Sequence, residues 1–379
     1  MRTILYVGAY RFPNKDAAAK RVLGIGMALR LAGYKVVFAG GEQGCSDKMN
    51  LFEGFEYYSM GELDHPERGI FSRFKNFVNA GAKTVSWIET YLTRNKVDAI
   101  ILYNSSYVFQ LKLRNICKRK GITLIGDCTE WYDPAHLPGG RYGPVAIDNY
   151  LKMNIGYKRF NGLIVISSYL RKFYEKDVKH IIIVPPLNIT TFEFQPIIRS
   201  KYRTIIYAGS PGKKDNLDVV INAIHKVNTL QLKILGISRD DYVRCNPNIN
   251  LSDRVIFLGR VDYDDVIREY KESDFSIIIR PNKRYAHVGF PTKLVESLSC
   301  GIPVISTNTS DIAKYIKDSE NGFVLRNDSQ ECVEEIFKKI ESFDDKQILM
   351  FKANAFRTSI LFNYDLYSQK LNDFILSLL

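Results

Sequence analysis

The chain has 379 residues, 46% of them hydrophobic and 25% charged, a balance that is typical of folded globular proteins and excludes wholesale disorder. A single ordinary core does not reach this length, so we expect two domains of about 150–200 residues. The formal net charge of +12 favours anionic partners: nucleotide phosphates, nucleic acid or an acidic membrane face.

The motifs that the sequence lacks disfavour several classes of protein. Lys and Arg form no dense run, and no helix-turn-helix, RNP or zinc-finger motif is present, so we expect no nucleic acid partner. The six cysteines form no C-x-x-C pair, which indicates reduced thiols rather than a disulfide framework or a zinc site. We recognise no cleaved leader and no apolar stretch of membrane-spanning length, so we expect a cytoplasmic protein, at most peripheral on the inner face of the cell membrane.

Alternating strands and helices run through the first half of the chain. Apolar runs and helical spacing predict strands at 3–8, 35–40, 99–103, 123–127, 162–166 and 181–184, and helices at 17–31, 107–120 and 167–175. The stretch 185–202 holds three prolines and forms secondary structure poorly, so it indicates a linker. We therefore expect an N-terminal α/β domain at residues 1–190.

The same alternation resumes after the linker. Strands are predicted at 203–209, 232–236, 255–259, 275–279 and 303–306, and helices at 217–228 and 264–273, within a second domain at 191–360. An apolar stripe predicts a helix at 364–379, inside a C-terminal segment 361–379 that packs on the domain before it or back on the N-terminal domain. The alternation predicts parallel sheets, with ligands bound in a cleft at the carboxyl ends of the strands.

The segment 285–311, YAHVGFPTKLVESLSCGIPVISTNTSD, carries the strongest functional signal. A loop with Gly289, Phe290 and Pro291 opens a short helix that holds Lys293 and Glu296. The first N–H groups of such a helix and its positive end favour a phosphate, and a carboxylate one turn later can accept hydrogen bonds from a ribose diol. The alternative is an ordinary helix–strand unit in which Glu296 is solvated.

The order of these motifs resembles the retaining glycosyltransferases of family 4. The resemblance rests on VGFPTKLVESLSCGIPVIST, NGFVL at 321–325, FLGRVDYDDVIREYKESDFSIII, YAGSPGKKDNLDVVINAI and the N-terminal FPNKDAAAKRVLGIGMALRLAGYKVVF. It implies the GT-B fold, two Rossmann-like doubly wound parallel-sheet domains with a cleft between them. It also implies transfer of a sugar from a nucleoside diphosphate sugar to a glycan or lipid-linked acceptor, in surface polysaccharide synthesis, with no cofactor and no metal.

The sequence departs from the family pattern at four places. Val288 stands where the family has the first of two glutamates, so recognition of the donor sugar differs or depends on neighbours such as His287. The opening loop has three alanines, 17–19, where many members have paired glycines, and Ser210 stands where the family has an arginine. The histidine in the middle of the N-terminal domain is replaced by GDCTEWYDP.

The resemblance assigns the donor side of the reaction to the second domain. Lys213 or Lys214 in the phosphate loop would stabilise the leaving diphosphate, with Lys214 counted as catalytic, and Glu296 would bind the ribose. The donor-binding residues are expected to be Gly209, Ser210, Lys213, Lys214, Arg260, Arg280, His287, Gly289, Phe290, Pro291, Thr292, Lys293, Leu294 and Glu296. A solvated basic loop and a surface arginine remain the alternatives for the lysines and for Arg280.

The acceptor side falls in the first domain. Asp127 and Glu130 follow a predicted strand, and either could orient the acceptor hydroxyl or take its proton; the alternative is a carboxylate that caps a helix. Trp131 could stack on a sugar ring or pack in the core. The opening loop and helix place Ala18, Ala19 and Arg21 on the acceptor side. The acids of Asp262-Tyr263-Asp264-Asp265 precede a helix and indicate an N-cap or first-turn acid rather than a metal site.

Two questions stay open at the level of sequence. The function could instead be that of a nucleotide-sugar epimerase of the same fold, or of a non-catalytic nucleotide-sugar-binding subunit. The stretch 69–96 mixes cations with Phe71, Phe74, Phe77 and Trp87, so it suits either an interfacial helix on an anionic membrane surface or an ordinary core segment.

Overall fold

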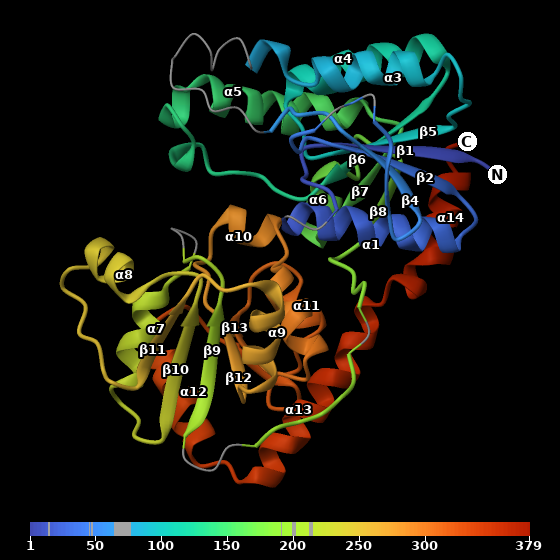
Figure 1. The fold of residues 1–379 in the computed structure, drawn as a ribbon. Coiled ribbons are helices and arrows are strands. Elements are labelled where there is room, and N and C mark those ends of the chain that lie inside the picture. Colours follow the sequence, from blue (N-terminus) through green and yellow to red (C-terminus); the bar gives the residue numbers. More distant parts are fainter. Residues whose placement is uncertain are drawn as a thin grey trace. The chain divides into compact units, whose positions relative to one another are not determined.

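The computed structural model describes residues 1–13, 16–44, 46, 48–63, 77–190, 192–198, 202–211 and 215–379. The chain divides into two compact units, and Figure 1 shows that each is a sheet flanked by helices. Unit 1 is Met1–Ile189 together with Asn363–Leu379, and unit 2 is Thr190–Phe362. The first boundary lies inside the proline-containing stretch 185–202.

Unit 1 is built on an eight-stranded sheet, as far as the described ranges show, with the order β3-β4-β2-β1-β5-β6-β7-β8. Its strands are β1 (Thr3–Gly8), β2 (Lys35–Gly40), β3 (Asn50–Phe52), β4 (Phe55–Ser59), β5 (Ala99–Tyr103), β6 (Thr123–Cys128), β7 (Gly162–Val165) and β8 (His180–Ile183). Its helices are α1 (Ala17–Leu31), α3 (Ala82–Tyr91), α4 (Tyr107–Lys120), α5 (Pro144–Leu151), α6 (Ser168–Tyr174) and α14 (Ser368–Leu376). The predicted strands and helices of this half are confirmed, with ends shifted by a residue or two.

The hairpin of β3 and β4 was not predicted. These strands are antiparallel, whereas β4 pairs with β2 in parallel. Glu53 and Gly54, which join them, both have positive φ, and this is the backbone of a tight two-residue hairpin turn. Glu-Gly is a weak signal for that turn, so the edge of the sheet escaped a prediction based on turn residues.

The end of the chain belongs to unit 1. A 3₁₀ turn at Tyr364–Tyr367 leads into α14, which packs beside α1 (Figure 1). Leu371, Phe374 and Ile375 are buried in the same core as Ile4 and Tyr6 of β1. The predicted apolar stripe is therefore correct, although the α-helical part is shorter than 364–379.

Helix α3 shows whether part of the stretch 69–96 faces a membrane surface or the core. Trp87 is buried and packs against Tyr58 and Tyr91, with ring centroids 4.8 and 5.1 Å apart. This tryptophan serves the core of unit 1 rather than an interfacial surface, while residues 69–76 of the same stretch lie outside the described ranges. Within the described ranges, no helix has the length and apolar content needed to cross a bilayer.

Unit 2 contains a six-stranded, fully parallel sheet within the part of the chain that the structure describes, in the order β11-β10-β9-β12-β13-β14. Its strands are β9 (Arg203–Ala208), β10 (Leu230–Leu235), β11 (Val255–Gly259), β12 (Phe275–Ile278), β13 (Val304–Thr307) and β14 (Gly322–Leu325). Its helices are α7 (Leu217–Ile224), α8 (Arg239–Cys245), α9 (Tyr263–Lys271), α10 (Arg284–Val288), α11 (Thr292–Ser299), α12 (Gln330–Glu341) and α13 (Asp345–Ser359).

Strand β9 shows how the sheet of unit 2 buries both of its faces. Ile205 and Tyr207 point into a core shared with α7, α12 and α13, whereas Ile206 and Ala208 join a second core with Tyr270 of α9. Successive strand residues face opposite sides of a sheet, so a continuous apolar run is what a doubly covered strand requires. Every residue of β12 and β13 is likewise buried, and the hydroxyl groups of Ser276 and Ser306 are hydrogen-bonded inside the unit.

Local signals fix the helix ends. The Ser106 side chain accepts from the N–H of Phe109 at the start of α4, and Gly121, with φ +66°, follows its end. Asp344 and Gln347 form a reciprocal capping box at the start of α13. Each such cap contributes about 1 kcal/mol, and together they place the helices where the apolar faces need them.

Candidate functional site

The sheet of unit 2 has a switch point between β9 and β12. From β9 the strand order runs outward through β10 to β11, and from its neighbour β12 it runs the other way through β13 to β14. Loops at the carboxyl ends of two such strands lead away from each other and leave a crevice, which is where ligands of open parallel sheets bind. Gly209 follows β9 at this point and Arg280 follows β12.

Gly209 is required by the geometry of this switch point. Its φ of +128° is one that other residues rarely adopt. A Cβ here would lie 2.5 Å from Cε and 2.8 Å from Nζ of Lys293. Gly236, at the end of β10, also has positive φ, and its missing side chain leaves room for the backbone at Gly209. The glycines thus let the Lys293 amine lie directly on the backbone that leaves β9.

Lys293 is the best-placed cation of the site. It lies one residue inside α11, and its Nζ is 4.2 Å from the centroid of the Tyr207 ring. Burial, together with the positive charge of Arg280, lowers the pKa of Lys293, while the carboxylates of Asp215 and Glu296 act in the opposite direction. A partly buried amine with these neighbours favours a ligand that brings negative charge.

Arg280 is held at the same edge by its backbone. Its N–H donates to Thr307 Oγ1 over 3.0 Å, and the Thr307 hydroxyl donates to the Arg280 carbonyl over 2.9 Å. These bonds join the ends of β12 and β13. They fix the Arg280 backbone at the end of β12, and the charge of Arg280 acts on Lys293.

Helix α11 adds the polarity of its N-terminus. Pro291 is its N-cap, and no side chain caps the first turn. The preceding Phe290 is buried against Tyr315 and Phe362, and Leu294 is fully buried, so the start of the helix is fixed on both sides. An uncapped helix start beside two cations is well suited to an oxyanion.

Glu296 lies one turn further along α11 and is half-buried. Its charge, after burial, raises the pKa of Tyr263 and of Tyr270. The carboxylate thus interacts electrostatically with the α9 tyrosines and with the Lys293 amine on its own helix. This is a position from which it can accept hydrogen bonds from a diol.

The structure shows the surroundings of His287 and Val288, the two positions that bear on recognition of the donor sugar. Both nitrogens of the His287 ring are used: Nε2 lies 2.6 Å from Asn282 Oδ1, and Nδ1 accepts from the N–H of Ser310 over 3.4 Å. A sugar hydroxyl would have to displace one of these bonds. The neighbouring Val288 is fully buried, so the position of the absent glutamate faces the core. Of the two possibilities open at Val288, this packing favours a different recognition of the donor sugar over a contact from His287.

The phosphate-loop lysines, Lys213 and Lys214, lie outside the described residues. Ser210 is exposed, and its hydroxyl donates to the Gly236 carbonyl over 3.2 Å, so it stabilises the loop. Arg260 is exposed and follows the end of β11, on the same edge of the sheet as Gly209.

Several polar groups at this edge of the unit 2 sheet were not predicted from the sequence. Within the part of the chain that the structure describes, Tyr207 Oη, Thr309 Oγ1 and Ser310 Oγ are buried and have no hydrogen-bond partner. Thr309 and Ser310 follow β13, next to His287. The only signal for Thr309 and Ser310 is the run NTSD directly after a predicted strand, and Tyr207 is part of the predicted strand 203–209. Buried polar atoms without partners are uncommon and mark sites where a ligand can supply the missing bond.

In unit 1, the structure contradicts the catalytic assignment of Asp127. Its side chain is fully buried. Asp127 Oδ1 accepts from Arg21 Nη2 at 2.7 Å, and Oδ2 accepts from the Tyr6 hydroxyl at 2.6 Å. Arg21 is also buried and donates through Nη1 to the Val184 carbonyl at 2.8 Å. Asp127 and Arg21 therefore join α1 to β6 and the end of β8, and neither faces an acceptor.

Three other acceptor-side assignments are also corrected. The N–H of Ala19 is bound by the N-cap Asp16 over 2.8 Å, so it is unavailable to a ligand, and Ala18 packs against the core. Trp131 is buried and makes an edge-to-face contact with Phe173, with ring centroids 4.7 Å apart. Glu130 is half-buried and remains the carboxylate that follows β6 with access to solvent.

A cavity of about 580 Å³ lies at the switch point of the unit 1 sheet, where β1 and β5 are neighbours. Gly8, Gly41, Glu62, Ser105 and Phe109 are among the residues that line it. None of the residues predicted for the acceptor side lines this cavity, because those predictions came from positions along the chain rather than from the sheet order.

Comparison with known proteins identifies the region that holds the unit 2 site. Residues 188–357 match the family described as "Glycosyl transferases group 1". The match contains Gly209, Arg280, Lys293 and Glu296. The chitobiosyldiphosphodolichol beta-mannosyltransferase of Debaryomyces hansenii is 24% identical over 182 residues, which is 43% of this chain and 38% of that protein. The aligned part thus spans well under half of that relative.

Solved structures show the fold over the whole chain. Sucrose-phosphate synthase from Thermosynechococcus elongatus superposes with a TM-score of 0.76 at 13% identity, covering 100% of this chain and 99% of that one. The Anabaena protein HepE, solved with UDP and glucose, gives 0.68 at 14% identity and covers 99% of both chains. WaaG, a glycosyltransferase involved in lipopolysaccharide biosynthesis, gives 0.65 at 14% identity over 98% and 99%. The fold is GT-B, as the sequence predicted.

The DYDD stretch of the glycosyl transferases group 1 region is part of a helix start. Asp262 is the N-cap of α9, although its side chain makes no capping bond, and Asp264 and Asp265 lie in the first turn. Asp265 forms an ion pair with Arg268 one turn later, at 2.7 Å. Among the described residues, no group of three or more His, Cys, Asp or Glu side chains is arranged to hold a metal ion.

Proposed function

We propose that the protein is a retaining glycosyltransferase that moves a sugar from a nucleoside diphosphate sugar to a glycan or lipid-linked acceptor. The observation that carries this proposal is the Lys293 amine lying against Gly209 at the switch point of unit 2, within the glycosyl transferases group 1 match. A conserved fold alone would not carry it, since one fold serves many chemistries.

The donor diphosphate is bound by Lys293, Arg280 and the uncapped start of α11. Negative charge grows on the leaving diphosphate as the bond between the anomeric carbon and the phosphate oxygen breaks, so these groups stabilise the transition state more than the ground state. Glu296 binds the ribose diol. Thr309, Ser310 and Tyr207 have unused hydrogen-bonding capacity at the same edge. Lys213 and Lys214 remain sequence-based candidates for a second phosphate contact.

The acceptor is assigned to unit 1, where Glu130 is the candidate for orienting its hydroxyl. The electron pair of the breaking bond goes to the leaving phosphate oxygen, the acceptor oxygen bonds to the anomeric carbon, and the acceptor proton passes to the leaving group. Similar proteins support the acceptor class: one bears the name of a mannosyltransferase acting on a chitobiosyl-diphosphodolichol, and another acts in lipopolysaccharide biosynthesis. We extend this to surface polysaccharide synthesis at an anionic membrane face.

We also propose that the reaction needs neither a metal nor a cofactor, because two cations and a helix start already provide the positive charge. The assay below is therefore run with EDTA. Activity that requires added Mg²⁺ or Mn²⁺ would contradict this part of the proposal and would direct attention to the acids of α9.

A second candidate is a non-catalytic nucleotide-sugar-binding subunit. Burial of Val288 and the two bonds to His287 leave the donor sugar without the acid that the family uses, and this favours binding without efficient transfer. An epimerase of the same fold would change a free nucleotide sugar in the absence of any acceptor.

One experiment separates these functions. A thermal-shift panel of nucleoside diphosphate sugars identifies the donor, since a ligand stabilises the fold by mass action. Donor consumption is then followed by NMR with and without a panel of glycan and lipid-linked acceptors. Donor consumption that requires an acceptor, with a product of the same anomeric configuration as the donor, supports the transferase. Conversion without an acceptor indicates the epimerase, and binding without conversion indicates the subunit.

A further inference from the structure

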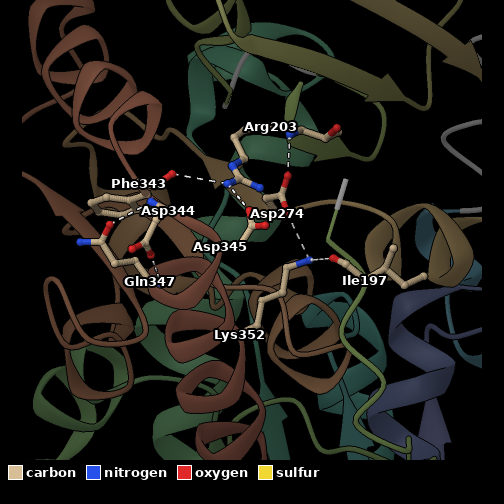
Figure 2. Close-up of polar contacts among 9 residues, drawn as sticks. Ile197, Arg203, Asp274, Phe343, Asp344, Asp345, Gln347 and Lys352 are labelled. Atoms are coloured by element: carbon tan, nitrogen blue, oxygen red, sulfur yellow. Dashed lines mark hydrogen bonds and ion pairs between the residues drawn. The ribbon is translucent and has the colours of Figure 1, made fainter. Parts of the chain in front are cut away.

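Three lysines are buried in the part of the chain that the structure describes: Lys152, Lys233 and Lys352. Lys233 is paired with Glu269, and Lys352 is also compensated. Lys352 on α13 is 1% exposed. Its Nζ donates to the Ile197 carbonyl at 2.6 Å and lies 3.3 Å from Asp274 Oδ1 (Figure 2). Asp274 in turn accepts from the N–H of Thr204 at 2.9 Å. The buried charge of Lys352 is therefore balanced inside unit 2, where it fastens the segment before β9 to α13.

Lys152 in unit 1 lacks such a partner. It is 5% exposed and begins a π-helix, Lys152–Gly156, directly after α5. Its Nζ lies 3.3 Å from Asn104 Oδ1 and 5.5 Å from the centroid of the Tyr132 ring. Across the described ranges, no carboxylate comes within ion-pair distance of it. Burial lowers the pKa of Lys152, and electrostatic interactions with Cys128, Asp148 and Glu130 act in the opposite direction.

The surroundings of Lys152 are polar and incompletely bonded. Asn104 follows β5 with φ +27°, and Glu130 and Tyr132 follow the neighbouring β6, so Lys152 lies at the carboxyl ends of these two strands. Two nearby polar atoms, Ser105 Oγ and Asn149 Oδ1, are buried without a hydrogen-bond partner in the described structure. Ser105 also lines the 580 Å³ cavity of unit 1. A π-helix, a left-handed asparagine and orphaned polar atoms are each costly features that gather at functional sites.

We propose that Lys152 binds an oxyanion, a phosphate or a carboxylate, carried by the acceptor of the reaction. This inference rests on the proposed function, because only a transferase has an acceptor. A buried ammonium with one amide oxygen as its hydrogen-bond partner has donors to spare, and an oxyanion supplies both the missing charge and the missing acceptors. Glu130 then orients the reacting hydroxyl, and Lys152 selects acceptors that carry negative charge.

The alternative is that Lys152 is structural, with Asp148 as its distant counter-ion. Asp148 Oδ1, however, accepts from the N–H of Tyr107 at 2.9 Å at the start of α4, so this carboxylate already has a structural partner. An uncompensated buried charge lowers the stability of a fold, whereas a compensated one becomes necessary to it. Replacement by methionine is therefore expected to have opposite effects on stability at Lys152 and at Lys352.

The first test compares Lys152→Met with Lys352→Met by urea unfolding. Lys352→Met leaves Asp274 buried without its cation, so its unfolding midpoint should fall, or the protein should fail to fold. Lys152→Met removes an unpaired charge and keeps the volume, so its midpoint should stay the same or rise. A fall in the Lys152→Met midpoint like that of Lys352→Met would show a structural lysine and overturn the inference.

The second test measures binding of inorganic pyrophosphate by calorimetry. Lys293→Met is used as the background, because the unit 2 site also binds oxyanions. Pyrophosphate should still bind to this variant, about tenfold or more weakly when Lys152→Met is added, the range for a lost charged hydrogen bond. Adding Lys152→Arg, which keeps the charge, should restore the binding. Equal affinity of the single and double variants would overturn the inference.

Two further probes distinguish the sources of the oxyanion in the same variants. Glucose 1-phosphate represents a soluble sugar phosphate, and phosphatidylcholine vesicles with and without phosphatidic acid represent a lipid-linked phosphate. The vesicle arm is included because the outer face of α5 exposes Ile147 and Tyr150. Dependence on Lys152 in either arm assigns the source. Since neither probe requires transfer, an enzyme that fails to transfer sugar contradicts the proposed function alone.

Discussion

At the scale of the residue, the chain pairs charges that lie far apart in sequence. Arg21 and Asp127 are 106 positions apart and form a buried, multiply bonded pair in unit 1. A sequence pattern shows an acid after a strand and a basic residue on a helix, but it does not show that they meet. For this reason the half-buried Glu130 and the fully buried Asp127 of GDCTEWYDP were indistinguishable before the structure.

The pair Asp127 and Glu130 gives a direct comparison. Asp127→Asn keeps the shape but leaves the Arg21 charge buried, so the free energy of unfolding should fall by about 3–5 kcal/mol. Glu130→Gln is half-buried and should change it by about 0.5 kcal/mol or less, while reducing sugar transfer. Urea unfolding and a transfer assay measure both quantities. The assignment is reversed if Asp127→Asn is stable and inactive.

Lys293 should give donor binding a pH dependence. Because burial and Arg280 lower its pKa, the amine loses its charge at a lower pH than an ordinary lysine, whose pKa is about 10.4. Affinity for a nucleoside diphosphate should therefore fall as pH rises through this lowered pKa. The stability effect has the opposite sign: the unfolded state binds the proton more readily, so this group makes the fold more stable as pH rises.

Calorimetric titrations at increasing pH measure the effect on binding. Lys293→Arg is the control, since a guanidinium stays charged over the whole range. Its affinity should show a flat profile where the wild type declines. The same decline in both proteins would assign the pH dependence to another group.

At the scale of the element, the site depends on how strand ends meet a helix start. Repetition of apolar runs ending in glycine made β9, β10 and β11 predictable, and the GFPTK run made α11 predictable. The order of the strands was not encoded in any local pattern. It alone brings Gly209 and Arg280 to one switch point, although α7, β10, α8, β11, α9 and β12 lie between them along the chain.

Gly209→Ala tests the contact between Gly209 and Lys293, and its control separates backbone strain from the steric clash with Lys293. The new Cβ meets Lys293 and also occupies a left-handed backbone region, so we expect a loss of about 1–3 kcal/mol in stability and weaker donor binding. Gly33→Ala is the matched control, because Gly33 has φ +90° but no atom within 4 Å of the added Cβ. It should be destabilised by strain alone and bind the donor normally. Equal donor affinity in both variants would show that the Gly209–Lys293 contact is not part of the site.

Glu296 tests the second turn of α11. Glu296→Ala should weaken binding of a nucleoside diphosphate by about 1–3 kcal/mol, the range for a lost charged hydrogen bond, with the fold intact. Glu320→Ala removes a carboxylate that is 63% exposed on the same unit and should leave the affinity unchanged. A deoxyribose version of the ligand should bind both proteins equally if Glu296 reads the ribose. Unchanged affinity in a folded Glu296→Ala protein would remove this assignment.

At the scale of the whole molecule, composition and alternation of elements predicted more than any single residue did. Two α/β units and the GT-B fold followed from strands and helices that alternate on both sides of a proline-containing linker. The β3–β4 hairpin did not follow, because its Glu-Gly turn is a weak signal. The membrane surface stays a prediction, now without Trp87, which packs inside unit 1.

The structure locates some of the cations that contribute to the net charge of +12. Lys293 and Arg280 lie at the switch point of unit 2, and Lys152 lies under the carboxyl ends of β5 and β6 in unit 1. Each unit thus has a partly or fully buried cation near the carboxyl ends of its strands.

Calorimetric titration of UDP, GDP and ADP into the wild type, Lys293→Met and Lys339→Met tests the central claim most directly. Lys339 is the matched control, since its Nζ also lies over an aromatic ring, 5.0 Å from the centroid of Phe323, but at a distance from the switch point along α12. We predict that at least one nucleotide binds the wild type and Lys339→Met alike, and binds Lys293→Met about tenfold or more weakly. The account is contradicted if no nucleotide binds, or if Lys293→Met binds as tightly as Lys339→Met.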